Sequence, residues 1–138
     1  MQADAGTEAA VRAILDRLAD VYVTRDAAVL ASVFAPDPDV VMYSPGAEPV
    51  VGLSDIQAKA ISDWTRSDAA SLTYRRTSVS AAGSVAWVAT DADFVVSAAG
   101  AETTTPVRIT FVLVERGKEW RIVHAHYSLA PAAVGHPG

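Results

Sequence analysis

The 138-residue chain contains no cysteine, and this absence removes three kinds of chemistry from consideration. Without thiols the chain has no disulfide, no thiolate zinc site and no cysteine nucleophile. Lysine is scarce as well, since only Lys59 and Lys118 occur, and the formal net charge is -5. No basic block stands out along the chain, so we expect no nucleic-acid partner.

Long apolar runs are also missing. No segment approaches the roughly 20 apolar residues of a membrane-spanning helix. The N-terminus "MQADAGTEAAVR" lacks the basic and apolar regions of a secretion signal. Glycines stand singly in turns, so there is no phosphate-binding glycine loop, and no Ser/His/Asp nucleophile arrangement can be identified. We therefore expect a soluble, cytoplasmic protein without a membrane partner.

What the chain does contain suits one packed domain. The apolar content is 51%, most of it alanine and valine, and a chain of this length can bury a core without disulfides. No internal repeat or linker interrupts residues 1–138. We expect a single domain with its core over about residues 7–130 and a loose tail at 131–138, where proline and glycine are frequent.

The first half of the chain reads as helices with two short strands between them. Apolar residues at helical spacing predict a helix over residues 7–24, with Thr7 as its N-cap. Asp26 can cap a second, short helix that the prolines of "APDPD" end. Residues 40–43 and 50–52 read as short strands. Ser54 can cap a third helix that runs to about residue 67 and buries four side chains, which are Ile56, Ala60, Ile61 and Trp64.

After residue 70 the pattern changes to strands. Four segments at 71–81, 85–97, 103–115 and 119–130 are separated by the turn signals "AAGS", "SAAGAE" and "ERGK". Helices followed by an antiparallel meander predict an α+β domain. We expect a cone-shaped fold in which three N-terminal helices pack on a strongly curved, mostly antiparallel β-sheet and enclose a pocket.

Three stretches carry a resemblance to a known family: "VFAPDPDVVMYSPGAEPVVG", "GSVAWV" and "RITFVLVERGKEWRIVHAHYS". The chain resembles the nuclear transport factor 2-like superfamily, also called the SnoaL-like or ketosteroid isomerase-like fold. Its closing hairpin is also similar to the calmodulin-dependent kinase association domain. The resemblance implies a small-molecule ligand, chemistry without a cofactor, and a homodimer through the outer sheet face. It does not imply one reaction, because this fold hosts isomerases, cyclases, dehydratases and non-catalytic modules.

The ketosteroid isomerase mechanism itself does not carry over. By the resemblance, Tyr43 stands where those enzymes have the general-base aspartate, and Thr110 stands where they have the oxyanion-stabilising aspartic acid. Leu18 stands where they have the oxyanion-hole tyrosine. A tyrosine with a pKa near 10 is a poor base at neutral pH, so all three catalytic groups are replaced.

The same resemblance assigns the faces of the strands. It places Asp91 and Trp87 in the pocket, together with Arg108, Thr110 and Tyr127. Because side chains alternate along a strand, Trp120, Ile122, His124, His126 and Ser128 are then expected on the outer face. A single β-bulge in the last strand would exchange the faces of Tyr127 and His126.

Three residues are candidates for proton transfer and charge stabilisation. Asp91 is a carboxylate within an apolar strand, where charges usually pair or serve a site, so we assign it as the base. Its alternatives are a position on a solvated strand edge and an ion pair with an arginine such as Arg75 or Arg76. Arg108 could stabilise an oxyanion or form a structural ion pair with Asp91. Tyr43 could donate a proton to an oxyanion, or line the pocket.

The pair His124 and His126 remains open between three interpretations. Two residues apart on a strand, the rings lie on one side about 6.5–7 Å apart, which would suit a metal. A third ligand is hard to find, since His136 lies in the Pro/Gly tail, and we expect no metal site. The pair therefore finishes a strand at an interface, or His126 acts as a catalytic acid or base.

Apolar and aromatic side chains complete the candidate site. We expect six residues to contact the substrate: Leu18, Trp64, Trp87, Thr110, His124 and Tyr127. Aromatic walls favour a flat or apolar ligand. The sequence thus predicts an isomerase, cyclase or dehydratase that works by proton transfer on a small apolar or aromatic molecule. The alternatives are a non-catalytic dimerisation module of the same fold and a ligand carrier without turnover.

Overall fold

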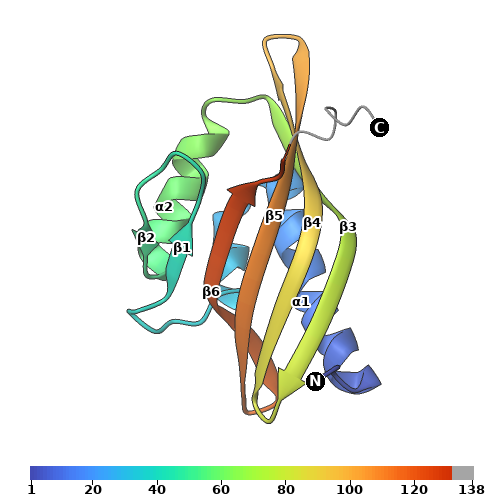
Figure 1. The fold of residues 1–138 in the computed structure, drawn as a ribbon. Helices are drawn as coiled ribbons and strands as arrows, with labels where there is room; N and C mark the ends of the chain where they lie inside the picture. The colour runs from blue at the N-terminus through green and yellow to red at the C-terminus, as the bar shows by residue number, and fades with distance from the viewer. Residues whose placement is uncertain (132–138) are drawn as a thin grey trace, which may run out of the picture.

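The structure, a computed structural model, describes residues 1–131, and the predicted loose tail falls almost entirely outside them. The chain forms helices and strands in the expected order (Figure 1). The helical elements are α1 (Ala5–Thr24), the 3₁₀ helix η1 (Ala27–Ser32) and α2 (Leu53–Trp64). The strands are β1 (Val41–Tyr43), β2 (Val50–Val51), β3 (Ala69–Ala82), β4 (Val85–Ala98), β5 (Ala101–Arg116) and β6 (Glu119–Leu129).

The six strands form one curved sheet in the order β2-β1-β6-β5-β4-β3. All neighbours are antiparallel except β1 and β6, which run parallel. In Figure 1, α1 crosses behind the long strands, α2 lies beside β1 and β2, and the β4–β5 hairpin projects beyond the rest of the sheet. The predicted α+β cone is confirmed, with the helices on the concave side of the sheet.

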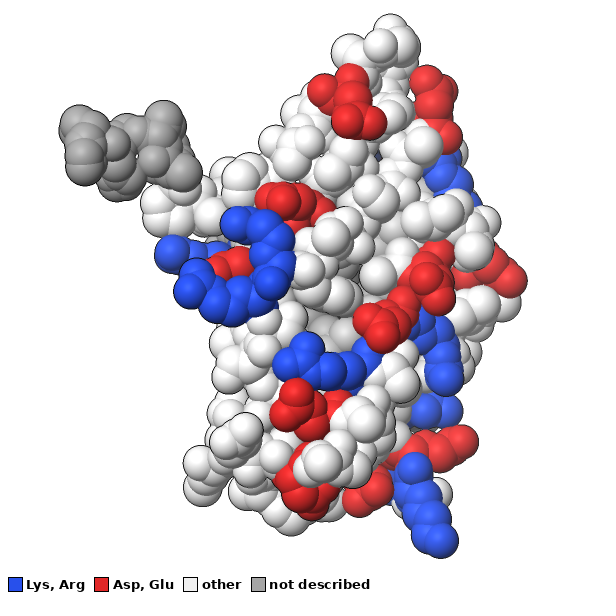
Figure 2. Space-filling model, turned by 90° about the vertical axis from the view of Figure 1, so that its right-hand side faces the viewer, with Lys and Arg blue, Asp and Glu red and all other residues white. Residues whose placement is uncertain are grey.

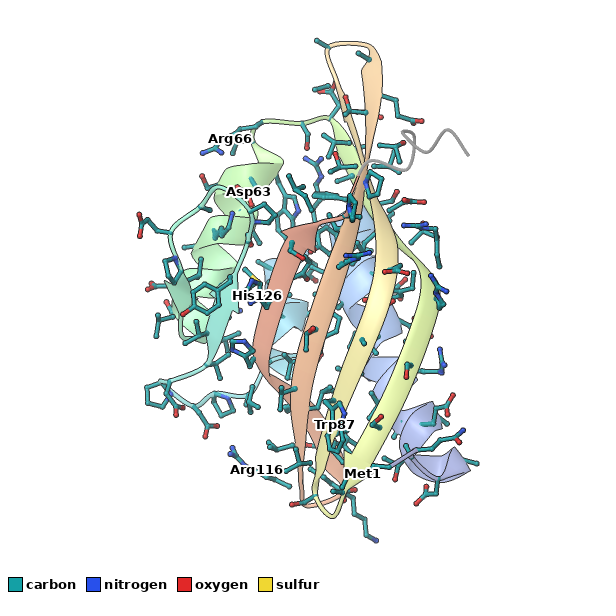
Figure 3. All side chains as sticks on the ribbon, viewed as in Figure 1. Met1, Asp63, Arg66, Trp87, Arg116 and His126 are labelled. Atoms are coloured by element: carbon teal, nitrogen blue, oxygen red, sulfur yellow. The ribbon has the colours of Figure 1, made fainter. Side chains whose placement is uncertain are left out.

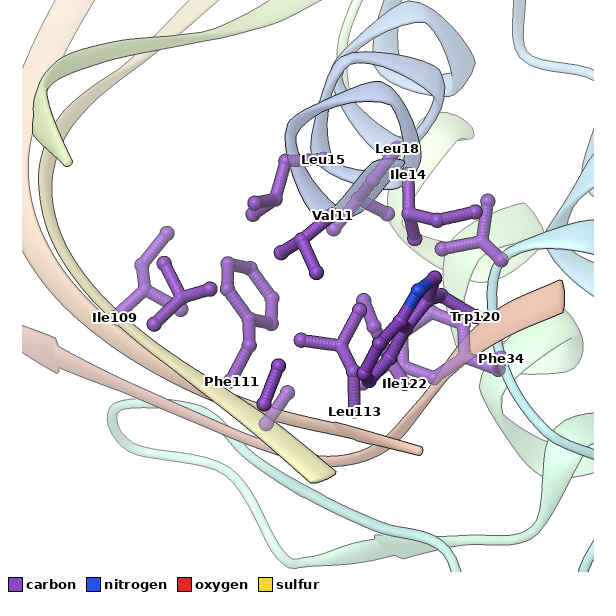
Figure 4. Packing of buried hydrophobic residues seen from close by; sticks show 14 of the residues in the cluster. Val11, Ile14, Leu15, Leu18, Phe34, Ile109, Phe111, Leu113, Trp120 and Ile122 are labelled. Carbon is purple, nitrogen blue, oxygen red and sulfur yellow. The ribbon is translucent and has the colours of Figure 1, made fainter. Parts of the chain in front are cut away.

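The core lies between α1 and the inner face of the sheet. Val11, Leu15 and Leu18 on α1 are buried against strand residues such as Phe111 and Ile122 (Figure 4). Burying a side chain of this size contributes about 1.5–3 kcal/mol, so this stripe holds the helix on the sheet. It also fixes which residues of the last turn of α1 face the inside of the cone.

Two of the three predicted helix caps differ in the structure. The carboxylate of Asp4 accepts the backbone N–H of Thr7 at 2.7 Å, so Asp4 rather than Thr7 caps α1. Gly52 with a φ of 85° precedes α2, which replaces the predicted cap at Ser54. Asp26 does cap η1, through the N–H of Ala28. The glycine reaches a backbone conformation that a serine disfavours, which explains where α2 begins.

The helix α2 buries fewer residues than predicted. Ile56 is buried, and Ala60 and Trp64 pack against the core from the side. Ile61 is 53% exposed and was wrongly expected inside. The helix packs mainly on η1 and β2, so its contact stripe is narrow and Ile61 falls outside it.

A β-bulge at Val123 decides the faces of β6. Val112 on β5 pairs with His124 while the next residue, Leu113, pairs with Ile122, so Val123 is an extra residue. Ile122 exchanges backbone hydrogen bonds with Val33 and Ala35, whereas His124 is paired with β1. The bulge therefore lies where β6 changes its neighbour at this edge.

Charged residues of both signs are interspersed on the side of the molecule formed by β3 and α1 (Figure 2). Ion pairs such as Arg12 with Glu8 and Arg75 with Asp93 account for part of this mixture. Within residues 1–131, no helix combines the length and the apolar content needed to cross a bilayer.

Candidate functional site

The cone encloses a cavity of about 460 Å³ between α1, α2 and the inner face of the sheet. This volume lies within the range of about 300–1,000 Å³ that is usual for small-molecule sites. Its walls are mainly apolar, with Leu18 from α1, Leu72 from β3, Phe94 from β4 and Val107 from β5. The cavity can therefore hold a small apolar molecule and shield it from water.

A pair of tyrosines places two hydroxyl groups inside the cavity. Tyr22 comes from the last turn of α1 and Tyr127 from the inner face of β6, and their hydroxyl oxygens lie 3.3 Å apart. The ring of Tyr22 meets Phe94 edge to face, and the ring of Tyr127 meets Phe111 in the same way. Packed aromatic neighbours hold both rings, so the hydroxyls have fixed positions.

Burial raises the pKa of both phenols above the usual value for tyrosine. For Tyr22 burial is the main cause, the bond to Tyr127 acts against it, and the charge of Asp63 raises the pKa further. For Tyr127 burial again comes first, followed by the neighbouring tyrosines. Protonated hydroxyls in an apolar site are hydrogen-bond donors, so they can bind a carbonyl or enolate oxygen.

Charged side chains gather where α2 ends. Lys59 Nζ donates to the carboxylate of Asp63 at 2.9 Å, and Arg66 Nη1 lies 3.8 Å from the other carboxylate oxygen. All three residues line the cavity. Figure 3 shows Asp63 and Arg66 close together near the upper end of α2, far from Trp87 at the lower end of the sheet. Among residues 1–131, Asp63 is the one carboxylate that lines this cavity.

The structure brings three of the predicted site residues into the cavity. Leu18, Trp64 and Tyr127 line it, as expected from the sequence. The remaining seven do not line it; they are Tyr43, Trp87, Asp91, Arg108, Thr110, His124 and His126. These seven lie on the outer face of the sheet, and the four of them on β4 and β5 alternate with buried residues.

The assignment of Asp91, Trp87, Arg108 and Thr110 to the pocket is therefore wrong. In β4 the inward positions are Ala86, Val88, Thr90 and Ala92, which are buried. Asp91 pairs with Arg108 across β4 and β5, and both point away from the core. The physical reason is the cost of burying unpaired charge, which keeps the charged positions of these strands outside.

The predicted faces of β6 were correct for some residues and wrong for others. Tyr127 faces inward and His124 and His126 face outward, as the face assignment predicted, and Ala125 also faces inward. Trp120 and Ile122 are buried on the inner side (Figure 4), which corrects their expected outer position. The extra residue Val123 allows both groups to face inward on one strand, since a regular alternation could not.

Asp91 takes part in an ion-pair network on the outer face. Arg76 Nη2 donates to its carboxylate at 3.0 Å, and Arg108 Nε lies 3.9 Å away. Asp93 has its own partner in Arg75 at 3.3 Å. An ion pair, one of the alternatives to a base for Asp91, describes these contacts. The base of the cavity must therefore come from another residue.

Tyr43 lies beside the two histidines on the outer face. Its ring centroid is 5.2 Å from that of His126 and 6.0 Å from that of His124. Tyr43 is 41% exposed and belongs to β1, which pairs with β6 in this region. In residues 1–131, no group of three or more His, Cys, Asp or Glu residues is arranged to hold a metal ion. His136, the weak third candidate, lies outside the described residues.

Four functional candidates were missed by the sequence reasoning: Tyr22, Lys59, Asp63 and Arg66. Tyr22 was counted as part of the apolar stripe of the first helix, although its hydroxyl makes it the polar member of that stripe. Lys59 and Asp63 stand four residues apart next to Trp64, a signal for one helix face. Nothing local indicated that this face borders the cavity.

Comparison with known proteins agrees with this geometry. The sequence profile of the SnoaL-like domain matches residues 11–133. The chain belongs to the SnoaL-like family. A search of curated proteins found no match.

Solved structures share the fold at low sequence identity. A nuclear transport factor 2-like superfamily protein from Salmonella enterica is 20% identical with a TM-score of 0.81, covering 96% of this chain and 99% of that chain. A Streptomyces avermitilis protein named as a proposed dehydratase is 16% identical, with a TM-score of 0.81 and coverage of 89% and 96%. A Novosphingobium aromaticivorans protein named as a proposed aromatic ring hydroxylase is 16% identical, with a TM-score of 0.84 and coverage of 94% and 93%. At these identities the likeness concerns the fold.

Proposed function

We propose that this SnoaL-like protein binds a small, flat and mostly apolar molecule in the cone cavity and acts on it by proton transfer without a cofactor. The reaction would be an isomerisation, a cyclisation or a dehydration. The observation that carries the proposal is the hydroxyl pair of Tyr22 and Tyr127 inside an apolar cavity that also has one carboxylate, Asp63, at its edge.

In this proposal each residue has a separate role. The tyrosine hydroxyls donate hydrogen bonds to a carbonyl oxygen and stabilise the negative charge that develops on it. The Asp63 carboxylate removes a proton from the carbon next to that carbonyl and forms an enolate. Asp63 then returns the proton to a different carbon in an isomerisation, or gives it to a β-hydroxyl, which leaves as water in a dehydration. Asp63 and Tyr22 are near enough for the charge of one to affect the pKa of the other.

The test begins with ligand binding. Thermal-shift screening of aromatic polyketide-like compounds, terpenoids and small acids should identify molecules that raise the melting temperature of the wild-type protein. For a compound that raises the melting temperature, Tyr127→Phe should lower turnover by about 10²–10³-fold, the usual loss of rate when an oxyanion donor is removed. Asp63→Asn should lower turnover by about 10²–10⁴-fold while binding changes little.

Asp91→Asn is the matched control for the base. It removes a similar carboxylate from the outer face of the sheet, so turnover should stay at the wild-type level. Full activity in Asp63→Asn, or a loss in Asp91→Asn as large as the one expected for Asp63→Asn, would refute the assignment of Asp63.

A specific observation favours a second candidate, a ligand carrier without turnover. The Asp63 carboxylate is already bonded to Lys59, and Tyr22 and Tyr127 are bonded to each other. In residues 1–131, no buried side-chain polar atom lacks a hydrogen-bond partner. A carrier predicts that compounds which raise the melting temperature are recovered unchanged after long incubation with the protein.

A further inference from the structure

The mouth of the cavity carries more positive than negative charge. The charged residues that line it are Lys59, Asp63 and Arg66, so two cations face one carboxylate. The ammonium of Lys59 has three donors and uses one of them on Asp63. Arg66 is 3.8 Å from Asp63, which is too long for a hydrogen bond, and its side chain is 74% exposed. Both cations therefore retain donors for an incoming acid group.

The segment that bears Arg66 is held in place by another arginine. Arg25 donates from Nη1 to the carbonyl oxygens of Trp64 and Ser67, at 2.8 and 3.0 Å, and from Nη2 to the hydroxyl of Ser67 at 2.9 Å. These bonds fix the backbone on both sides of Arg66. The position of its guanidinium at the mouth thus costs less conformational entropy than it would on a free loop.

The two polar features lie at different places in one apolar cavity. The tyrosine hydroxyls come from α1 and β6, and the cations come from the end of α2. Phe94, Leu72 and Val107 add apolar wall. A ligand that uses all three features has a carbonyl oxygen, an apolar body and an acid group.

We infer that the natural ligand is an organic anion whose carboxylate binds Lys59 and Arg66 at the mouth while its apolar body fills the cavity. This inference rests on the proposed function, because it names the substrate class of the same cavity. A neutral terpenoid or aromatic compound would leave both cations unused. A net positive mouth also attracts anions to an acidic protein that otherwise repels them.

Two fluorescent probes with nearly the same apolar body test the inference. Anilinonaphthalene sulfonate carries an acid group, and phenylnaphthylamine is its neutral counterpart. Both should bind the wild-type protein with increased fluorescence. At a salt concentration of about 1 M the screening length falls to about 3 Å. This should lower the affinity for the sulfonate and leave the affinity for the neutral probe unchanged.

Charge-removing variants assign the effect to the mouth. Lys59→Met and Arg66→Gln should each lower the affinity for the sulfonate about threefold to tenfold. The affinity for phenylnaphthylamine should fall by less than about twofold. The matched controls are Lys118→Met, which removes the other lysine, and Arg76→Gln, which removes an arginine paired with a carboxylate on the outer face. Neither control should change the affinity for the sulfonate by more than about twofold.

A cavity-filling variant locates both probes. Ala60→Trp places a large ring in the cavity wall and should weaken both probes at least about tenfold. If Ala60→Trp does not fold by circular dichroism, Val96→Trp fills the cavity from β4 instead.

The outcomes separate the two proposals. If phenylnaphthylamine does not bind, or binds the filled variant as well as the wild type, the proposed function fails and the inference fails with it. The inference alone is overturned in two cases, both with phenylnaphthylamine bound in the cavity. In the first, neither Lys59→Met nor Arg66→Gln changes the affinity for the sulfonate. In the second, the two controls lower that affinity as much as these variants do.

Discussion

At the scale of single residues, the cavity depends on hydroxyl groups that the surrounding side chains keep protonated. Tyr22 and Tyr127 bond to each other, and Tyr74 donates to the carbonyl oxygen of Leu15 on α1. Burial raises the pKa of all three phenols. The same surroundings that make the hydroxyls useful donors make their ionisation costly, so function and stability are coupled here.

This coupling predicts a loss of stability at alkaline pH. Because the folded pKa values are raised, the folded state holds more protons than the unfolded state above about pH 10, and the free energy of unfolding falls there as pH rises. Below about pH 10 these groups contribute no slope. Each such tyrosine makes the free energy of unfolding fall by up to about 1.4 kcal/mol per pH unit. Urea unfolding between about pH 9 and 11 measures this slope.

Tyr127→Phe should reduce that slope, and Tyr43→Phe on the exposed outer face is its matched control. An equal slope in Tyr127→Phe and wild type would contradict the raised pKa of Tyr127. Any general loss of stability from the substitution appears as a shift of the whole curve and not as a change in slope.

At the scale of elements, β6 pairs with two different segments along one edge, and a bulge between them keeps residues of both parts facing the core. Before Val123 its inner residue Ile122 pairs with the segment around Phe34, and after Val123 its partner at that edge is β1. The extra residue lets Ile122 and Ala125, three positions apart, both face the core. The bulge therefore sets Tyr127 into the cavity and His126 outside it.

Two single-residue deletions test the bulge. Deleting Val123 leaves Ile122, Ala125 and Tyr127 facing inward on a regular strand, so we expect a folded protein that loses about 1–2 kcal/mol. Deleting Ala125 and pairing without a bulge would turn His124 inward into a fully buried position, and we expect a loss above about 4 kcal/mol. Urea unfolding compares the two. Equal losses would mean that the bulge does not set the faces of β6.

At the scale of the whole molecule, the helices cover one face of the sheet and leave the outer face uncovered within residues 1–131 (Figure 1). That face carries Trp87, Thr110, Tyr43 and both histidines, together with the ion pairs of Asp91. The mixture of aromatic and paired charged groups suits contact with an identical surface, because like patches then meet with charges of both signs.

We propose that two copies pair through this outer face, as the family resemblance implies. Light scattering should report a dimer for the wild type, and Thr110→Glu, in the middle of the face, should weaken the dimer at least about tenfold by burying a charge. Ile61→Glu on the exposed side of α2 is the control and should leave the dimer unchanged. A monomeric wild type, or dissociation in Ile61→Glu alone, would refute this interface.

Much of the fold follows from local patterns in the sequence. Helical spacing in residues 7–24 predicted α1, and the turn signals predicted the four long strands to within a few residues. These features depend on neighbours within one turn or one hairpin, which the sequence displays directly. The order of elements then predicted an α+β cone, and the resemblance of three stretches to the SnoaL-like family gave its type.

The sequence by itself determined the elements, their order and three cavity residues, Leu18, Trp64 and Tyr127. The tertiary structure alone decided the faces of β4 and β5, since apolar residues occur at both odd and even positions there, as Trp87 and Val88 illustrate. It also joined Tyr22 to Tyr127 across 105 positions, and placed the charged end of α2 at the cavity mouth. Such contacts depend on sheet register and on a one-residue bulge, and no local pattern of residues specifies either.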